Sequence, residues 1–191
     1  MDKNRLEAFS DGVIAVIITI MVLEMKVPHG TDMAALVPLI PVFLTYVLSF
    51  VYLAIYWNNH HHMLHAVHTV TGGGLWANLH LLFWLSLIPF ATGWMSENHY
   101  ESLPVAVYGV VLFMAGVAYY IFERILVLHH GADSDLARAV GVEVKGIVSV
   151  LIYAVAIVVA FWFPIAACGL YVLVAILWLC PDPRIERLVR K

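Results

Sequence analysis

The sequence predicts an all-α integral membrane protein with six transmembrane helices. Of its 191 residues, 63% are hydrophobic and only 12% are charged, and the mean hydropathy is +0.91. Apolar stretches recur along the chain, several of them close to the about 20 residues that a helix needs to cross a bilayer. This composition is typical of multispan membrane proteins. A net charge of -3 without a basic block gives no indication of a nucleic-acid partner. We predict one domain over residues 1–191.

The first predicted span, residues 7–27, lies in the stretch RLEAFSDGVIAVIITIMVLEMKV. Because a helix turns about 100° per residue, one stripe of this helix collects seven side chains: Arg5, Phe9, Gly12, Val16, Thr19, Ile20 and Leu23. Ser10 and Asp11 fall roughly 120° to 140° away from the stripe by the same arithmetic. An unpaired carboxylate near hydrocarbon is costly, so Asp11 needs partners. Acidic residues near the charged end argue against a cleavable signal peptide.

Five further apolar stretches predict the remaining spans: residues 36–57, 75–95, 103–128, 144–163 and 165–180. The histidine-rich stretch 58–69 is expected to continue the second helix out of the hydrocarbon, and Gly72-Gly73-Gly74 to break it. Pro164 predicts a tight turn between the last two spans.

The basic residues predict the orientation in the membrane. Six spans place nearly all of them on the side of the termini: Lys3, Arg5, Arg124, Arg138, Lys145, Arg184, Arg187, Arg190 and Lys191. Lys26 alone falls on the other side, together with Glu24, Asp32, Glu97 and Glu101. The positive-inside rule therefore predicts that both termini are cytoplasmic, which requires an even number of spans.

No catalytic constellation is present in the sequence, so we do not expect an enzyme. Gly72-Gly73-Gly74 lacks the TVGYG pattern of carbonyl selectivity filters. Cys168 and Cys180 stand in apolar surroundings without metal-ligand spacing, which is typical of small packing residues. Nothing in the sequence indicates a cofactor.

A histidine cluster ends the second span: His60, His61, His62, His65 and His68. At helical spacing, His61 with His65, or His65 with His68, could share a zinc or copper ion, but no cysteine or acidic ligand stands near them in the sequence. The alternatives are pH sensing and ordinary packing at the cytoplasmic surface.

The aliphatic stripe of the first span also has two interpretations. Val16, Ile20 and Leu23 could pack against neighbouring helices, with the Thr19 hydroxyl bonded back to its own helix. Placed around a symmetry axis by several subunits, the same side chains would form aliphatic rings that gate conduction by dewetting.

Three motifs point to a known family. Arg5, Phe9, Ser10 and Asp11 spell RxxxFSD at the start of the first span. Trp57-x-x-His60-His61 closes the second span, and in the third span Asn78 precedes an apolar run to Pro89-Phe90. With these motifs the chain resembles the transmembrane protein 175 family of potassium channels. A single set of six spans looks like the prokaryotic form.

The resemblance implies a homotetramer in a bacterial inner membrane. Its pore would run along the fourfold axis, lined by the first helix and without a carbonyl filter. The positions matching the family's constriction are Val16, Ile20 and Leu23, with Thr19 as a hydroxyl layer. Potassium would be the permeant ion. We expect Ser10 and Asp11 to be structural and to bond to a supporting network of Trp57, His60 or His61, and Asn78.

The predicted function is therefore a potassium-preferring cation channel. One alternative is a proton- or metal-coupled secondary transporter that uses the cluster from His60 to His68 as its ion site. Another is a small membrane assembly factor without transport activity. The lack of charged residues in the middle of the spans weighs against the proton-coupled carrier.

Overall fold

The computed structural model describes residues 3–67, 69–131, 133–134, 136–137 and 144–179, and within these ranges it is helical and contains no strand. The all-α class predicted from the sequence is confirmed for this part of the chain. The elements are α1 (Lys3–Leu23), the 3-10 helix η1 (Met33–Leu39), α2 (Ile40–His65), α3 (Gly72–Ser86), α4 (Ile88–Glu97), α5 (Ser102–His130), α7 (Val144–Ala160) and α8 (Pro164–Leu179).

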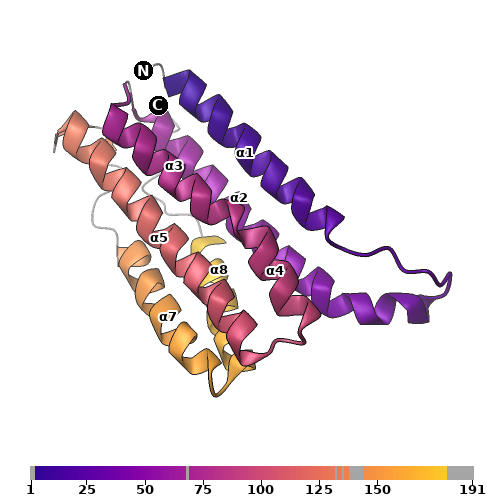
Figure 1. The fold of residues 1–191 in the computed structure, drawn as a ribbon. Helices are drawn as coiled ribbons and strands as arrows, with labels where there is room; N and C mark the ends of the chain where they lie inside the picture. The colour runs from indigo at the N-terminus through magenta and orange to yellow at the C-terminus, as the bar shows by residue number, and fades with distance from the viewer. Residues whose placement is uncertain (1–2, 68, 132, 135, 138–143, 180–191) are drawn as a thin grey trace.

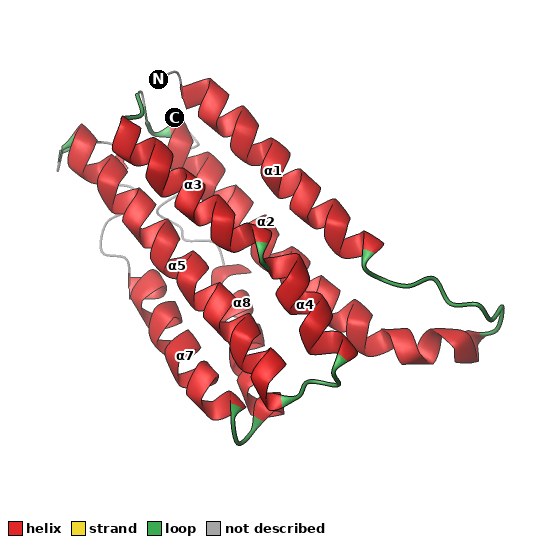
Figure 2. Cartoon of the chain, in the orientation of Figure 1, coloured by secondary structure: helices red, strands yellow, loops and turns green. Residues whose placement is uncertain are grey.

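The helices form one bundle in which α5 is central (Figure 1). It packs against α3 and α4 on one side and against α7 and α8 on the other. Helix α1 lies at the edge of the bundle, where it contacts α2, α3 and α4. Figure 2 shows short loops between most helices and a longer one between α1 and η1. This peripheral place leaves much of α1 uncovered.

The second span begins earlier than predicted and has two parts. The Asp32 side chain caps η1 by accepting a hydrogen bond from the backbone N–H of Ala35 at 3.1 Å, and α2 follows with Pro41 in its first turn. Helix α2 continues to His65, so the histidine-rich stretch does extend it, and the chain turns at Ala66.

The prediction that the glycine run breaks a helix is wrong. The helix has already ended at His65, and Gly72-Gly73-Gly74 forms the first turn of α3. The Thr71 hydroxyl accepts a hydrogen bond from the N–H of Gly74 at 3.2 Å and caps this turn. A favourable N-cap thus outweighs the low helix propensity of glycine.

The third span, predicted over residues 75–95, consists of two consecutive helices. Helix α3 ends at Ser86, Leu87 forms the junction, and α4 starts at Ile88 with Pro89 in its first turn. Proline has no N–H to donate to the preceding turn, and its ring disfavours a regular helix there. Pro89 therefore divides the span into two segments.

In the part of the chain that the structure describes, four helical segments are long and apolar enough to cross a membrane: Lys3–Leu23, Met33–His65, Gly72–Glu97 and Ser102–His130. The last two helices, α7 and α8, are apolar but have only 17 and 16 residues. A short turn at residues 161–163 joins them before Pro164, as predicted. Together with the four longer segments they make up the six helical segments expected from the sequence.

Candidate functional site

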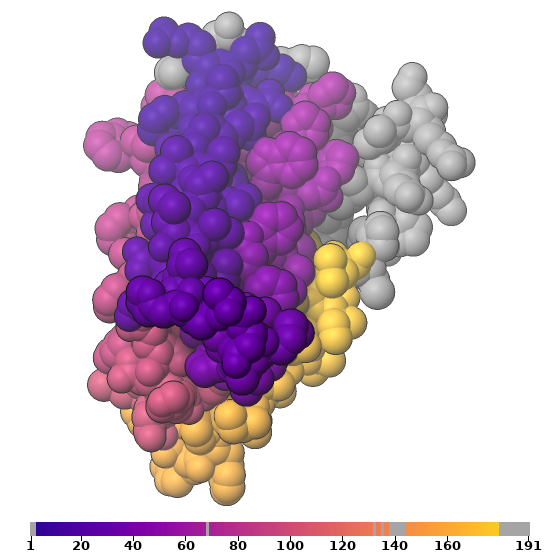
Figure 3. Space-filling view, turned by 90° about the vertical axis from the view of Figure 1, so that its right-hand side faces the viewer, coloured from indigo at the N-terminus to yellow at the C-terminus, as the bar shows by residue number. Residues whose placement is uncertain are grey.

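The candidate functional site is the face of α1 that points away from the bundle. Val16, Ile20 and Leu23 are 56%, 41% and 79% exposed, and Thr19 and Phe9 on the same stripe are exposed as well. Figure 3 shows α1 lying along the surface of this side of the molecule. The stripe identified by helical periodicity is therefore the uncovered face of the subunit. Within a single chain these side chains do not pack against neighbouring helices, which was the alternative interpretation of the stripe.

The opposite face of α1 is buried. Its five buried residues recur at intervals of three and four: Leu6, Ser10, Ile14, Ile17 and Met21. This spacing keeps them on one side of a 3.6-residue helix. They turn toward α2, α3 and α4, the elements that α1 contacts. Packing thus fixes the rotation of α1 and turns the aliphatic stripe outward.

Thr19 lies on the exposed stripe, and its hydroxyl donates to the carbonyl of Val16 at 2.8 Å. The sequence did not decide whether this hydroxyl bonds to its own helix, and in the structure it does. A hydroxyl that donates in this way still has lone pairs to accept a bond or to contact a cation. Thr19 can therefore present an oxygen on the exposed face.

A buried polar cluster attaches α1 to α2 and α3. Asn78 donates from Nδ2 to the hydroxyl of Ser10 at 3.0 Å, and its Oδ1 lies 2.8 Å from Nε2 of His60. Because an amide oxygen only accepts, Nε2 of His60 carries the proton. All three residues are at most 1% exposed, and the Ser10 hydroxyl donates onward to the carbonyl of Leu6. One amide thus links three helices.

A second, more exposed group of contacts lies beside this cluster. The indole N–H of Trp57 donates to the Asp11 carboxylate at 2.9 Å, and Nδ1 of His61 lies 2.8 Å from the Glu7 carboxylate. The rings of Trp57 and His61 stack with centroids 6.0 Å apart. The structure therefore brings together all the residues of the expected network, but in two groups, with Ser10 in one and Asp11 in the other.

The residues of RxxxFSD do not form one cluster. Arg5 and Phe9 lie on the exposed stripe, while Ser10 and Asp11 face the packed side. Glu7 was missed as a member of the network. It stands one helical turn before Asp11, so its spacing placed it on the same side of α1 as that carboxylate.

The histidine cluster is only partly described. The ring of His61 lies 5.7 Å from that of His62 and 6.3 Å from that of His65, between centroids, while His60 turns inward to Asn78. His68 lies outside the described residues. Within those residues, no group of three or more histidine, cysteine, aspartate or glutamate side chains is arranged to hold a metal ion.

An open groove of about 1010 Å³ runs along α1 and over α4. Phe9, Val16 and Ile20 of the stripe form part of one wall, and Phe90 and Trp94 of α4 belong to the other. The exposed stripe therefore continues into a largely apolar surface on a neighbouring helix.

Where the structure describes the chain it is helical, with several membrane-span candidates and an uncovered aliphatic stripe on the first helix, and these features define a multispan membrane protein. Residues 5–89 match the family described as "Endosomal/lysosomal potassium channel TMEM175". The chain is 51% identical over its full length, and over the full length of the relative, to a potassium channel of Chryseobacterium sp.. It belongs to the TMEM175 family, whose members are channels and not enzymes.

Other similar proteins agree with this assignment. A potassium channel of Streptomyces collinus is 31% identical over 62% of this chain and 61% of its own length. The "Endosomal/lysosomal proton channel TMEM175" of Gallus gallus is 30% identical over 68% of this chain and 29% of its own. A solved structure, titled as that of a lysosomal potassium-selective channel TMEM175 homolog from Chamaesiphon minutus, superimposes with a TM-score of 0.79. It has 27% sequence identity and covers 93% of this chain and 96% of the other.

Proposed function

We propose that this protein is a potassium-preferring cation channel in which four copies of the chain surround a pore lined by α1. The single observation that carries the proposal is the outward orientation of Val16, Ile20 and Leu23 in a chain of this family. A family relative of full-length similarity is named a potassium channel, which supports the choice of ion.

Conduction would follow from the chemistry of the stripe. Four copies of Val16, Ile20 and Leu23 around an axis form stacked aliphatic rings, which block ions by dewetting when narrow. A wider state would pass ions that shed part of their water at these rings. Potassium holds its hydration shell less tightly than sodium, so this barrier favours potassium without carbonyl ligands. Flow is passive and needs no cofactor.

The polar contacts on the other side of α1 would position the pore helix. Ser10 and Asp11 face α2 and α3, away from the proposed axis, and bond to Asn78 and Trp57. We assign them a structural role rather than a place in the ion path. The rotation of α1 set by these bonds decides which side chains form the rings.

We place the protein in a bacterial inner membrane with both termini in the cytoplasm. Two supporting basic residues, Lys3 and Arg124, belong to the ends of α1 and α5 on the side of the N-terminus in Figure 1. Lys26 lies at the opposite end of the bundle, where it pairs with Glu97 at 2.8 Å. The asymmetry agrees with the positive-inside rule.

Ion flux from liposomes tests the proposal. We expect purified protein to pass potassium faster than sodium, and Ile20→Asn and Leu23→Asn to change both the rate and the preference, because a polar ring holds water that an aliphatic ring excludes. Ile176→Asn on α8 is the matched control, since Ile176 is 53% exposed but belongs to a different helix. It should leave the flux unchanged.

The same assay separates the alternative transporter. Slow flux that follows a proton or zinc gradient, ignores the α1 substitutions and disappears in His61→Ala or His65→Ala would contradict the channel and favour coupled transport through the histidine cluster. Proton flux should be recorded as well, because the chicken relative is named a proton channel.

A further inference from the structure

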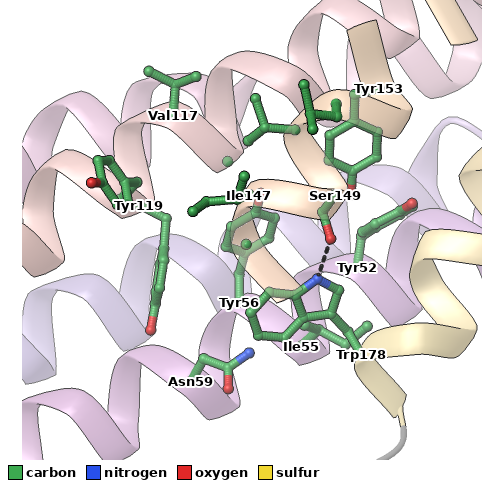
Figure 4. Close-up of a pocket in the computed structure, with 15 residues that line it drawn as sticks. Tyr52, Ile55, Tyr56, Asn59, Val117, Tyr119, Ile147, Ser149, Tyr153 and Trp178 are labelled. Carbon is green, nitrogen blue, oxygen red and sulfur yellow. Dashed lines mark hydrogen bonds between the residues drawn. The ribbon is translucent and has the colours of Figure 1, made fainter. Parts of the chain in front are cut away.

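A pocket of about 340 Å³ opens between α2, α5, α7 and α8 (Figure 4). None of its lining residues comes from α1, α3 or α4, so it is separate from the exposed stripe. Its volume lies within the range of roughly 300–1,000 Å³ that is usual for small-molecule sites. The proposed channel function makes no use of it.

Six of the fifteen described residues in the pocket wall are aromatic. Tyr52 and Tyr56 come from α2, Tyr153 from α7 and Trp178 from α8. The indole N–H of Trp178 donates to the hydroxyl of Ser149 at 2.8 Å, drawn as the dashed line in Figure 4. That bond satisfies the polar atom of Trp178 and fixes its ring, so the wall is preformed.

Two polar groups of the lining have no partner within the described part of the chain. Tyr56 is only 9% exposed, and its hydroxyl makes no hydrogen bond there. The hydroxyl oxygen lies 3.8 Å from the position that a Cβ on Gly116 would occupy, and Gly116 also lines the pocket. The half-buried Asn59 amide, also without a partner among these residues, lies at one end of the view in Figure 4. The Tyr56 hydroxyl does not belong to the fully buried polar atoms that lack a partner, so it keeps accessible surface at the pocket wall. A hydroxyl in that position can form a hydrogen bond with a molecule in the pocket.

The residues of the lining also determine whether a charged or a neutral ligand is favoured. Among the described residues, the lining contains no lysine, arginine, histidine, aspartate or glutamate. A charged molecule would lose its hydration there without gaining a partner. A pure hydrocarbon would leave the Tyr56 hydroxyl unbonded. A neutral, mostly apolar molecule with one oxygen satisfies both conditions.

We infer that this pocket binds a neutral amphiphile: an apolar chain or ring that carries one hydroxyl or carbonyl oxygen, hydrogen-bonded to Tyr56. On α2 the pocket is lined by residues from the middle and second half of the helix, Tyr52 to Asn59. Binding in this pocket does not depend on the proposed pore, so it can be tested separately from channel function.

Photolabelling locates the site directly. Purified protein in lipid nanodiscs is irradiated with an octanol that carries a diazirine, and the adducts are mapped by mass spectrometry. We expect adducts on the tyrosines of the pocket, reduced by an excess of plain octanol. Labelling that does not saturate, or that falls only on lipid-facing residues outside the pocket, would overturn the inference.

Gly116→Leu should remove this labelling. A Cβ at Gly116 meets nothing closer than the 3.5 Å contact with Val150, so the backbone accepts it and the rest of the leucine fills the pocket. Gly169→Leu on α8 is the matched control, because a Cβ there has no neighbour within 4 Å, and it should label normally. Equal labelling of Gly116→Leu and wild type would contradict the site.

Tyr56→Phe tests the hydrogen bond without filling the pocket. Octanol should compete about threefold to tenfold less well in this variant, the loss expected for one hydrogen bond. Fluorooctane, which lacks the hydroxyl, should compete equally in both proteins. If octanol and fluorooctane compete equally in the wild type, Tyr56 does not bond to the ligand.

Discussion

Helices α1 and α5 are held in the bundle in different ways. Helix α5 packs against α3, α4, α7 and α8, and its buried residues are largely apolar, including Tyr108, Leu112, Ala115 and Phe122. Helix α1 is covered on one side only and has a serine, Ser10, at the centre of its polar attachment. A helix that packs against four neighbours takes much of its orientation from shape. A helix packed on one side needs directional bonds, because apolar contacts alone resist rotation weakly.

The largest effect is expected at the amide that fixes α1. Asn78→Ala leaves both Ser10 and His60 buried without their partner, and each such loss costs about 1–3 kcal/mol. We expect a loss of about 2–5 kcal/mol in the free energy of unfolding, together with loss of the assembled form. Thermal unfolding and size-exclusion chromatography in detergent measure both.

Asn98→Ala is the control for that substitution. Asn98 donates from Nδ2 to the carbonyl of Trp94 at 2.8 Å, but it is exposed at the end of α4. Its loss should be small because water replaces the amide. If Asn98→Ala and Asn78→Ala unfold alike, the polar attachment of α1 is not what stabilises this side of the bundle.

The central helix should be most sensitive to added volume. A Cβ on Gly109 would overlap the hydroxyl of Tyr171 and come within 2.9 Å of Ile157. Tyr171 is fully buried, and its hydroxyl is bonded to the carbonyl of Val105, so it cannot easily move aside. We expect Gly109→Ala to lower the free energy of unfolding by about 1–3 kcal/mol, as overpacking does.

Gly116→Ala on the same helix gives the comparison. Its nearest contact is 3.5 Å, and alanine favours a helix over glycine. Stability should be unchanged or slightly higher in thermal unfolding. A destabilised Gly116→Ala beside a normal Gly109→Ala would reverse our account of α5 packing.

Asp11→Ala should have a smaller effect on the isolated subunit. Its bond to Trp57 is exposed, so water can replace it, and we expect about 0.5–1.5 kcal/mol in thermal unfolding. We expect assembly to suffer more than ion selectivity. A double-mutant cycle with Trp57→Phe isolates the bond. Normal oligomers with an altered ion preference would place Asp11 in the ion path instead.

The ion pair between Lys26 and Glu97 should contribute least. Hydrogen bonding and the charge of Glu97 raise the pKa of Lys26 above its ordinary value of 10.5. A raised pKa means that the contribution is complete below 10.5 and is lost as the pH rises through the higher folded value. Lys26→Met should lower the Tm slightly at neutral pH and low salt. The difference from wild type should vanish at strongly alkaline pH, and a constant difference would exclude the ion pair as its cause.

Sequence reasoning predicted the faces of single helices well. The period of α1 placed Val16, Ile20 and Leu23 together and turned Ser10 the other way, because both are properties of one helix. The all-α class followed from the high content of apolar residues, which is typical of multispan membrane proteins. The motifs of the family resemblance then pointed to Trp57, His60 or His61, and Asn78 as partners of Ser10 and Asp11.

Contacts between helices were predicted less well. The separation of Ser10 and Asp11 into two groups, and the bond between Glu7 and His61, depend on how α1 and α2 are offset along their axes. Periodicity carries no information on that offset. The division of the third span at Leu87 and the pocket lined by Tyr56 and Trp178 likewise arise from the packing of several helices.

The exposed aliphatic stripe of α1 has a consequence for how subunits would find one another. Lipid tails are as apolar as Val16, Ile20 and Leu23, so covering these side chains inside a bilayer gains no hydrophobic free energy. Any association through the stripe relies on close fit and on lipid displaced from the surface. The fraction of assembled protein then depends on the number of copies per area of membrane, and dilution into excess lipid is a means of taking it apart.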